Sequence, residues 1–152
     1  MRLIAHRGNI DGPNQLEENK PEYIENAISG GFDAEIDVWY DTDENNFYLG
    51  HDSPQYVVTQ NWLELHINKL WIHCKNLEAL YHFVNITNGY NYFWHQQDDF
   101  TLTSKNYIWT YPGKSYTKSS VIVMPEWDDV NWDNLKSINC FGICTDFINN
   151  LK

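Results

Sequence analysis

The stretch DAEIDVW, residues 33–39, decides the fold class of this chain. Its polar and apolar residues alternate, and successive side chains of a β-strand point to opposite faces of the sheet. Glu35 and Asp37 therefore project from one face of a predicted strand, and the apolar residues between them are expected to be buried. Two such carboxylates at a strand end suit a hard divalent cation, Mg²⁺ or Ca²⁺. The alternative interpretation is a solvated edge strand with two surface carboxylates.

Short apolar segments of this kind recur along the chain and alternate with polar, turn-rich segments. Several are apolar throughout, as strands buried on both faces of a parallel sheet should be. The predicted strands are residues 2–5, 33–39, 70–74, 91–95, 107–110, 120–124 and 139–143. The predicted helices are residues 21–30, residues 76–86 closed by Asn88-Gly89, and a shorter one over 61–66.

The alternation of strands and helices predicts a parallel α/β fold. Seven or eight such units would close a barrel, but the usual (β/α)8 barrel takes about 250 residues. The chain has 152 residues. Between residues 107 and 140 the helical signal is poor and the connections are short. We therefore expect a single domain over residues 1–152, a reduced (β/α)8 TIM-type barrel with several outer helices missing or shortened.

The composition limits the partners of this domain. The formal net charge is −11, which argues against a nucleic acid or an anionic membrane as partner, because both require basic surfaces. An anionic substrate would need a local positive site to overcome the overall repulsion. Aromatic residues make up 16% of the chain, so large flat side chains must fill the core or line a cleft.

The cysteines and the hydropathy indicate the cellular compartment of the protein. The three cysteines, Cys74, Cys140 and Cys144, complete no zinc pattern and are expected to be free thiols in a reducing environment. No signal peptide is evident, and no apolar run approaches the roughly 18 residues that a membrane helix needs. We expect a cytoplasmic protein.

Two histidine segments follow apolar runs in the first third of the chain. His6-Arg7-Gly8 comes directly after residues 2–5, and His51-Asp52 follows residues 47–50. Near neutral pH a histidine both accepts and donates protons, so two histidines on opposite sides of a phosphorus could divide these roles. Arg7 can grip phosphate oxygens in a forked geometry. Together with the carboxylate pair, these residues fit hydrolysis of a phosphate ester.

Further polar side chains occur along the later strands. His73 and Lys75 share a strand face by the same alternation, and His95 ends another predicted strand. For Asp146, which follows the last strand, we favour an ordinary role as the N-cap of the final helix.

Four motifs in a fixed order resemble the glycerophosphodiester phosphodiesterase family. They are His6-Arg7-Gly8, Glu18-Asn19, Glu35-x-Asp37 and His51-Asp52, and residues 142–146 resemble the last-strand segment of the same family. The resemblance implies a (β/α)8 barrel of the phospholipase-C-like type. It also implies that His6 and His51 are general acid and base, that Arg7 contacts phosphate, and that Glu35 and Asp37 are metal ligands.

The chain departs from the family pattern at the third metal ligand. The family has a carboxylate where this chain has His73. An imidazole suits Mg²⁺ and Ca²⁺ less well than a carboxylate does, and favours Mn²⁺ or Zn²⁺. The expected activity is metal-dependent hydrolysis of a small-molecule phosphodiester, glycerophosphodiester-like or sugar-linked. A cyclic phosphate is the expected intermediate. We expect Arg7, Lys75 and His95 to contact the substrate.

Two alternatives remain open. The chain could be a degenerate barrel that binds a phosphorylated ligand without turnover, or a structural protein that uses exposed aromatic faces. The missing helices also predict uncovered apolar surface near Trp109, Trp127 and Trp132, and hence a homodimer.

Overall fold

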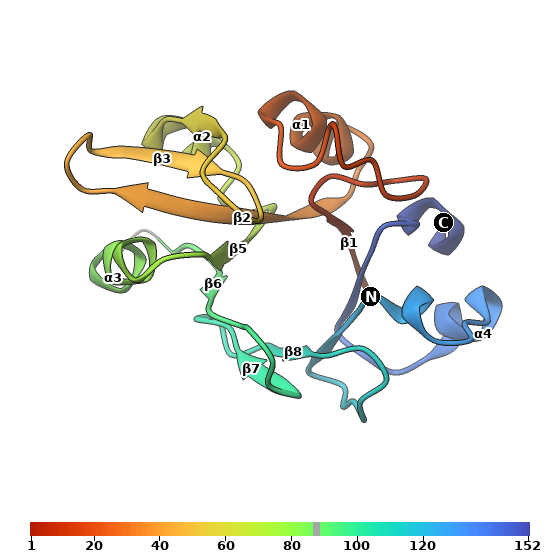
Figure 1. Ribbon diagram of the computed structural model, residues 1–152. Coiled ribbons are helices and arrows are strands. Elements are labelled where there is room, and N and C mark those ends of the chain that lie inside the picture. The colour runs from red at the N-terminus through yellow and green to blue at the C-terminus, as the bar shows by residue number, and fades with distance from the viewer. Residues whose placement is uncertain (87–88) are drawn as a thin grey trace.

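The computed structural model describes residues 1–86 and 89–152, and its strands form one curled, mixed sheet (Figure 1). Along the main path the strand order is β4-β3-β2-β1-β10-β9-β8-β7, and β5 and β6 branch from β2. The strands are β1 (Arg2–His6), β2 (Asp33–Asp41), β3 (Asn46–Leu49), β4 (Tyr56–Val58), β5 (Leu70–Cys74), β6 (Tyr92–Phe93), β7 (Phe100–Leu102), β8 (Ile108–Thr110), β9 (Ser120–Val123) and β10 (Gly142–Thr145).

The centre of the sheet is parallel, and it brings distant parts of the chain together. β1 lies between β10 and β2, with Ala5 opposite Thr145 on one side and Ala34 on the other. β2 also pairs in parallel with β5, so that Asp37 lies opposite His73. Consequently the carboxyl ends of β1, β2, β5 and β10 meet at one edge of the sheet.

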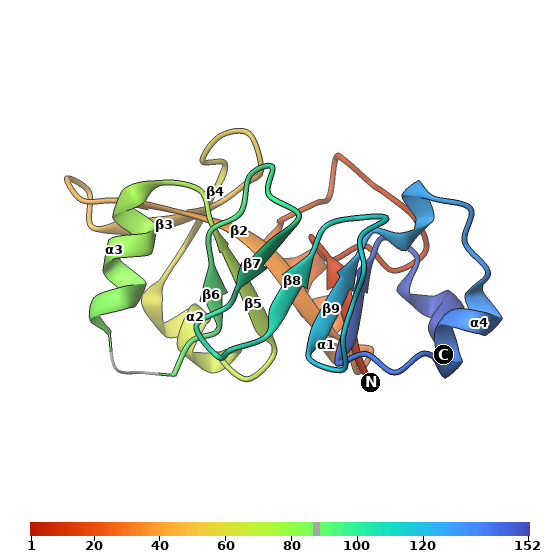
Figure 2. The ribbon, with the colours of Figure 1, turned by 90° about the horizontal axis from the view of Figure 1, so that it is seen from below.

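Helices are few and short, and they do not alternate regularly with the strands. The α-helices are α1 (Pro21–Ser29), α2 (Gln60–Leu65), α3 (Leu77–Asn85) and α4 (Trp132–Ser137), and two 3₁₀ turns are η1 (Pro125–Trp127) and η2 (Ile148–Leu151). Figure 2 views the sheet from the side of β7, β8 and β9, where none of the described helices lies in front.

The expected (β/α)8 TIM-type barrel is therefore wrong, and the fold is a curled half-barrel of mixed strands. β3, β4 and β7 pair antiparallel with their neighbours, and β6 pairs with β5 alone. The physical reason is the length of the connections. Parallel neighbours need a crossover of about a dozen residues or more, usually a helix. β8 and β9 are an exception to this rule, because they pair in parallel although residues 111–119 join them without a helix, and the outer helix that a barrel needs is missing there.

Most predicted strands are confirmed, with shifted ends. The strand expected over 33–39 extends to Asp41, and the one expected over 139–143 is β10, which begins at Gly142. β3, β4, β7 and α4 were not predicted. The predicted helix over 76–86 is α3, but its expected closing residue Asn88 lies outside the described residues.

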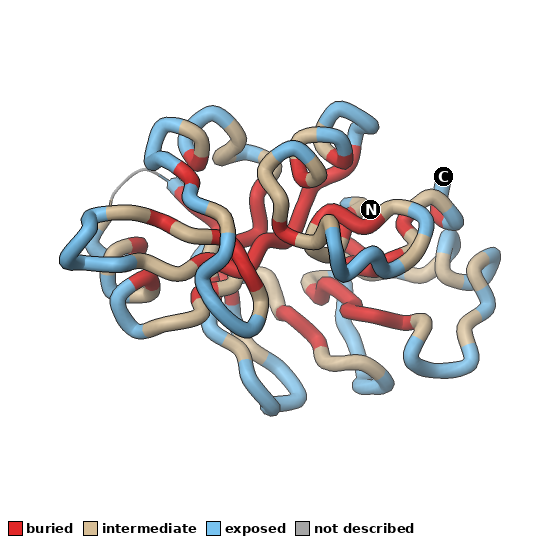
Figure 3. The backbone as a smooth tube through the Cα atoms, turned by 45° about the horizontal axis from the view of Figure 1, so that its top comes forward, coloured by how far each residue is buried: buried red, intermediate tan, exposed pale blue. Residues whose placement is uncertain are grey.

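Part of the core lies between the sheet and its helices, where the strand alternation predicted for β2 builds it, and a second buried cluster is formed by residues of β1, β5, β6, β8, β9 and β10. Ile36 and Val38 are fully buried in a cluster with Leu63 and Phe83 of α2 and α3. Figure 3 shows the buried residues concentrated along the strands. Of the three tryptophans expected at an uncovered surface, only Trp127 is largely exposed, and Trp109 is buried.

Among the described residues, none of the helices is both long and apolar enough to cross a membrane.

Candidate functional site

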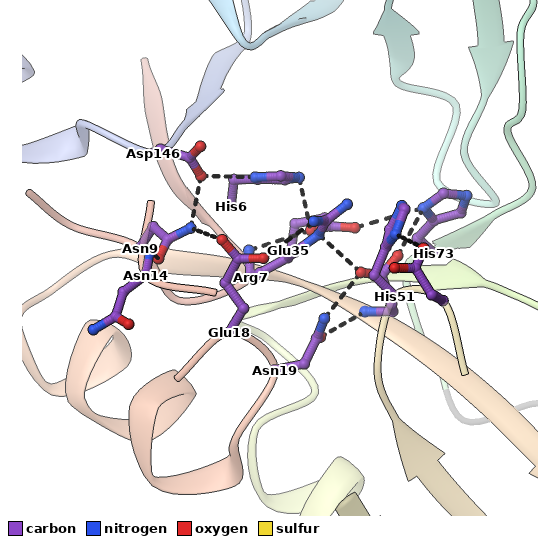
Figure 4. A network of polar contacts seen from close by, with 12 residues as sticks. His6, Arg7, Asn9, Asn14, Glu18, Asn19, Glu35, His51, His73 and Asp146 are labelled. Carbon is purple, nitrogen blue, oxygen red and sulfur yellow. Dashed lines mark hydrogen bonds and ion pairs between the residues drawn. The ribbon is translucent and has the colours of Figure 1, made fainter. Parts of the chain in front are cut away.

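Polar side chains gather where the carboxyl ends of β1, β2, β5 and β10 meet (Figure 4). Glu35 and Asp37 point to the same face of β2, as their spacing predicts, and both are buried. Burial of these two carboxylates is stabilised because neighbouring strands, and the residues next to them, supply positive charges and hydrogen-bond donors. The three acidic and histidine residues Glu35, Asp37 and His73 belong to strands β2 and β5.

His73 completes a cluster of three possible metal ligands with these two carboxylates. Its Nδ1 lies 3.1 Å from Asp37 Oδ1 and 3.7 Å from Glu35 Oε1. One ligand atom from each residue lies within 4.8 Å of the others. The other ring nitrogen, Nε2, donates to the backbone carbonyl of His95 at 2.8 Å, which directs Nδ1 toward the carboxylates. This second contact is the usual way in which a metal-binding imidazole is oriented.

The charges in this cluster stabilise one another. Burial alone would lower the pKa of His73, but its hydrogen bonds with Asp37 and Glu35 raise that pKa to about 9. Burial would likewise raise the pKa of Asp37, but the contact with His73 and the charge of Arg7 hold it well below its usual value. A divalent cation at this position must therefore displace a proton from His73.

The donor set fits a divalent cation. Asp37 Oδ1 is buried and has no hydrogen bond of good geometry, although the ion pairs place it near His73 and Lys75. A cation that binds this oxygen would take the place of the proton on His73 and compete with the Lys75 ammonium. Two carboxylates with one imidazole suit Mn²⁺ or Zn²⁺ as well as Mg²⁺.

His6 forms a second functional unit with Asp146 at the end of β10. Its Nδ1 is 2.8 Å from Asp146 Oδ1, and its Nε2 is 3.9 Å from Glu35 Oε2. Burial would lower the pKa of His6, but the hydrogen bond to Asp146 and the charge of Glu35 raise it. Asp146 has a lowered pKa, because the bond from His6 outweighs the effect of burial. A carboxylate that orients a histidine in this way is typical of proton-transfer sites.

Arg7 lies between the carboxylates rather than free in solvent. Its Nη1 donates to Glu18 at 3.1 Å, and its Nε lies 3.0 Å from Asp37 Oδ2. Its backbone has a φ of 51°, in the left-handed region, and its N–H donates to the carbonyl of Glu35. Asn19, also at positive φ, donates to Asp37 from its side-chain amide and accepts from the Asp37 backbone N–H. The strained turns thus fix Arg7 and Asn19 against β2.

Two adjacent clefts border this network. The first, of about 360 Å³, is lined on its ionic side by His6, Arg7, Glu18, Glu35, His73 and Asp146. The second, of about 290 Å³, is lined by Arg7, Gln15, Glu18, Asn19, His51, Asp52 and Gln55. The clefts share Arg7, Gln15 and Glu18.

The predicted acid-base pair is divided between these clefts. His6 lines the first and His51 the second. The His51 side chain is 42% exposed, and its Nδ1 is 2.7 Å from the neighbouring Asp52. The two histidines are therefore brought to one region of the molecule but not into contact.

The remaining predicted substrate contacts, His95 and Lys75, differ in their position relative to the clefts. His95 lines the first cleft, with Nε2 2.6 Å from the carbonyl of Asp98. Lys75 lies 3.5 Å from Asp37 Oδ1 and lines neither cleft, so its nearest described partner is a carboxylate of the cluster.

Asp146 and Asn9 are site residues that the sequence analysis did not assign. The expected N-cap role of Asp146 is wrong, because the residue before η2 is Phe147 and the Asp146 carboxylate instead accepts from His6 and Asn9. One signal was available. Asp146 directly follows a predicted strand, as do the other polar residues of the site.

Comparisons with protein-family models, with curated proteins and with solved structures find no match to this chain. Its function must therefore be argued from the site.

Proposed function

We propose that this protein is a metal-dependent phosphodiesterase that hydrolyses a glycerophosphodiester-like or sugar-linked phosphodiester, as the resemblance of its motifs implies. The observation that carries the proposal is the placement of His6 in the same cleft as Glu35 and His73, two members of the cluster that Asp37 completes from beneath the surface. His6 Nε2 lies 3.9 Å from Glu35, while Asp146 holds its Nδ1. A proton-transfer group beside a cation site is what phosphate-ester hydrolysis requires.

Each residue then has a role that follows from its position. A divalent cation bound at the cluster would supply positive charge that neutralises the phosphate and lowers the pKa of an attacking hydroxyl. His6, oriented by Asp146, takes the proton of that hydroxyl. Arg7 borders both clefts and contacts the phosphate oxygens, while His51 donates a proton to the alcohol that leaves on the other side.

The nucleophile is assigned to the substrate. Cys74 and Cys144 are buried, and burial raises the pKa of Cys74 to about 12. Neither thiol lines the two clefts. As in the family that the motifs resemble, the attack then comes from a substrate hydroxyl adjacent to the ester oxygen, which forms a cyclic phosphate and releases one alcohol before water opens the ring. Direct attack by water is the alternative, and equally fast cleavage of a diester without such a hydroxyl would favour it.

A second function, binding of a phosphorylated ligand without turnover, is favoured by the separation of His6 and His51, which line different clefts. In either function a phosphate has to compete with Glu18 and Asp37 for the Arg7 guanidinium. The dyad of His6 and Asp146 argues for turnover, because binding alone does not need an oriented histidine.

Hydrolysis of glycerol-linked diesters with added Mn²⁺, Mg²⁺ or Zn²⁺ tests the proposal. We expect turnover that chelation abolishes and that Glu35→Gln removes, while Asp133→Asn, an exposed carboxylate far from both clefts, retains it. Full activity in excess chelator contradicts the metal. Tight binding of the diester without any turnover favours the second function.

A further inference from the structure

The first cleft has two chemically different sides. Its ionic side carries His6 together with Glu35 and His73 of the cluster. The other lining residues are mostly apolar: they are Trp109, Tyr111 and Trp127, together with Pro13, Gln15, Pro112, Val123, Met124 and His95. We call Trp109, Tyr111 and Trp127 the aromatic wall.

The aromatic wall is built from the ends of β8 and β9. Trp109 belongs to β8 and packs against Phe93, with ring centroids 4.5 Å apart, so its position is fixed by the core. Tyr111 directly follows β8, and Trp127 ends η1 after β9. The Tyr111 and Trp127 rings are nearly perpendicular, at 78°, with centroids 6.4 Å apart. Two rings in this arrangement present a face and an edge to a third ring.

Trp127 is exposed without an evident structural reason. It is 62% exposed although it is the largest kind of apolar side chain and lies at the mouth of the cleft. Exposed aromatic residues of this kind are typical of ligand-binding sites.

The two sides of the cleft differ in the charge of their side chains. All the carboxylates and the arginine that line it lie on the ionic side, and the only titratable groups on the other side are His95 and Tyr111. His95 Nε2 is already occupied by the carbonyl of Asp98. The aromatic wall thus offers a flat apolar surface, and it has no charged side chain that could pair with a cationic or anionic group of the ligand.

The size of the cleft also limits its occupant. About 360 Å³ is at the lower end of the range for small-molecule sites, which suits a small ligand. A phosphate at the ionic side leaves room for one ring-sized group.

We propose that the aromatic wall binds an uncharged ring carried by one alcohol of the phosphodiester, with Trp127 as the residue that determines this specificity. The inference rests on the proposed function, because the ionic side must hold the phosphate. The shared chemistry is a ring with a flat apolar face. It is present both in aromatic rings and in the C–H face of a sugar.

Binding of four phosphate monoesters by calorimetry, with Mn²⁺ present, tests the proposal. Methyl phosphate reports the ionic side alone, phenyl phosphate adds an aromatic ring, glucose 6-phosphate adds a sugar ring, and phosphocholine adds a cation. We expect at least one of the two ring esters to bind roughly tenfold more tightly than methyl phosphate, the scale of one stacked ring. Whichever of the two ring esters binds more tightly shows whether the ring of the ligand is aromatic or a sugar.

Two variants separate the aromatic wall from the rest of the site. Trp127→Ala should abolish the preference for a ring and leave the affinity for methyl phosphate and for Mn²⁺ unchanged. Trp94→Ala, at another exposed tryptophan that lines neither cleft, should change none of these affinities.

The outcomes distinguish the inference from the proposed function. Equal affinity for the ring esters and methyl phosphate overturns the inference alone, as does a preference for phosphocholine or a ring preference that Trp127→Ala retains. Failure of all four phosphates to bind overturns the proposed function, and the inference with it.

Discussion

At the scale of single residues, the contact between His6 and Asp146 joins the two ends of the chain and sets the chemistry of the cleft. We predict that His6→Ala and His51→Ala each lower phosphodiester turnover roughly 100-fold or more, the usual contribution of a positioned proton-transfer group. Steady-state rates on a glycerol-linked diester measure the effect. His66→Ala, at a histidine outside both clefts, serves as the control. Turnover like that of the wild type in either variant would reject the role of that histidine.

His73 is the residue that sets the preference for a metal. Replacing it by Glu exchanges a nitrogen donor for a carboxylate, so His73→Glu should shift the preference from Mn²⁺ or Zn²⁺ toward Mg²⁺ or Ca²⁺. Direct titration with each cation measures the shift. Unchanged relative affinities would show that His73 is not a ligand, and would leave Glu35 and Asp37 as candidates.

Some of these residues could be predicted from the sequence and others could not. Glu35 and Asp37 follow from strand alternation, because the neighbouring positions are apolar. Asp146 does not, because an aspartate before a final turn is typical of an N-cap. Only the parallel pairing of β1 with β10 brings its carboxylate to His6, 140 positions away in the sequence.

At the scale of elements, the strands and the parallel pairing of most consecutive ones were predictable, whereas the antiparallel strands β3, β4 and β7 and the absence of pairing between the described strands β6 and β8 were not. The apolar segments identify β1, β2, β5, β8 and β9. Their order suggested a barrel, but the pairing depends on what connects them. β7 turns back antiparallel onto β8 over a few residues, and this leaves no crossover helix on that side. Connection length therefore mattered more than strand order.

The turn after β3 is the element that positions His51, and it depends on Gly50. The φ of Gly50 is 148°, and a Cβ there would overlap the carbonyl oxygen of Ser53. Gly50→Ala should therefore destabilise the fold by about 2 kcal/mol or more. Gly31→Ala provides the matched control. Gly31 also has a positive φ, of 94°, but a Cβ there meets nothing within 4 Å.

Denaturant unfolding of the two glycine variants separates the cost of a positive φ, which both share, from the cost of the overlap with Ser53, which only Gly50→Ala has. Gly50→Ala should unfold at a lower denaturant concentration than Gly31→Ala. Turnover should also fall in Gly50→Ala, because His51 follows directly. Equal destabilisation by the two substitutions would mean that the Ser53 contact relaxes without cost.

At the scale of the whole molecule, the acidic chain places three cationic side chains around one fully buried carboxylate. The net charge is −11, yet Arg7, His73 and Lys75 all lie near Asp37. The fold therefore compensates a buried carboxylate locally while its surface stays acidic. Stability and the site are consequently linked through the same ion pairs.

This linkage predicts how the stability of the metal-free protein depends on pH. In the unfolded chain His73 titrates at its ordinary value of 6.5, whereas in the folded protein its pKa is about 9. The stabilisation is fully present below pH 6.5 and is lost as the pH rises through about 9. The shift corresponds to a loss on the order of 3 kcal/mol in the free energy of unfolding. Urea unfolding in EDTA at pH 6 and at pH 9.5 measures it for the wild type and for His73→Gln. Because glutamine does not titrate, the variant should be less stable at pH 6 and should lose much less stability by pH 9.5. A loss as large in His73→Gln as in the wild type would assign the pH dependence to other groups.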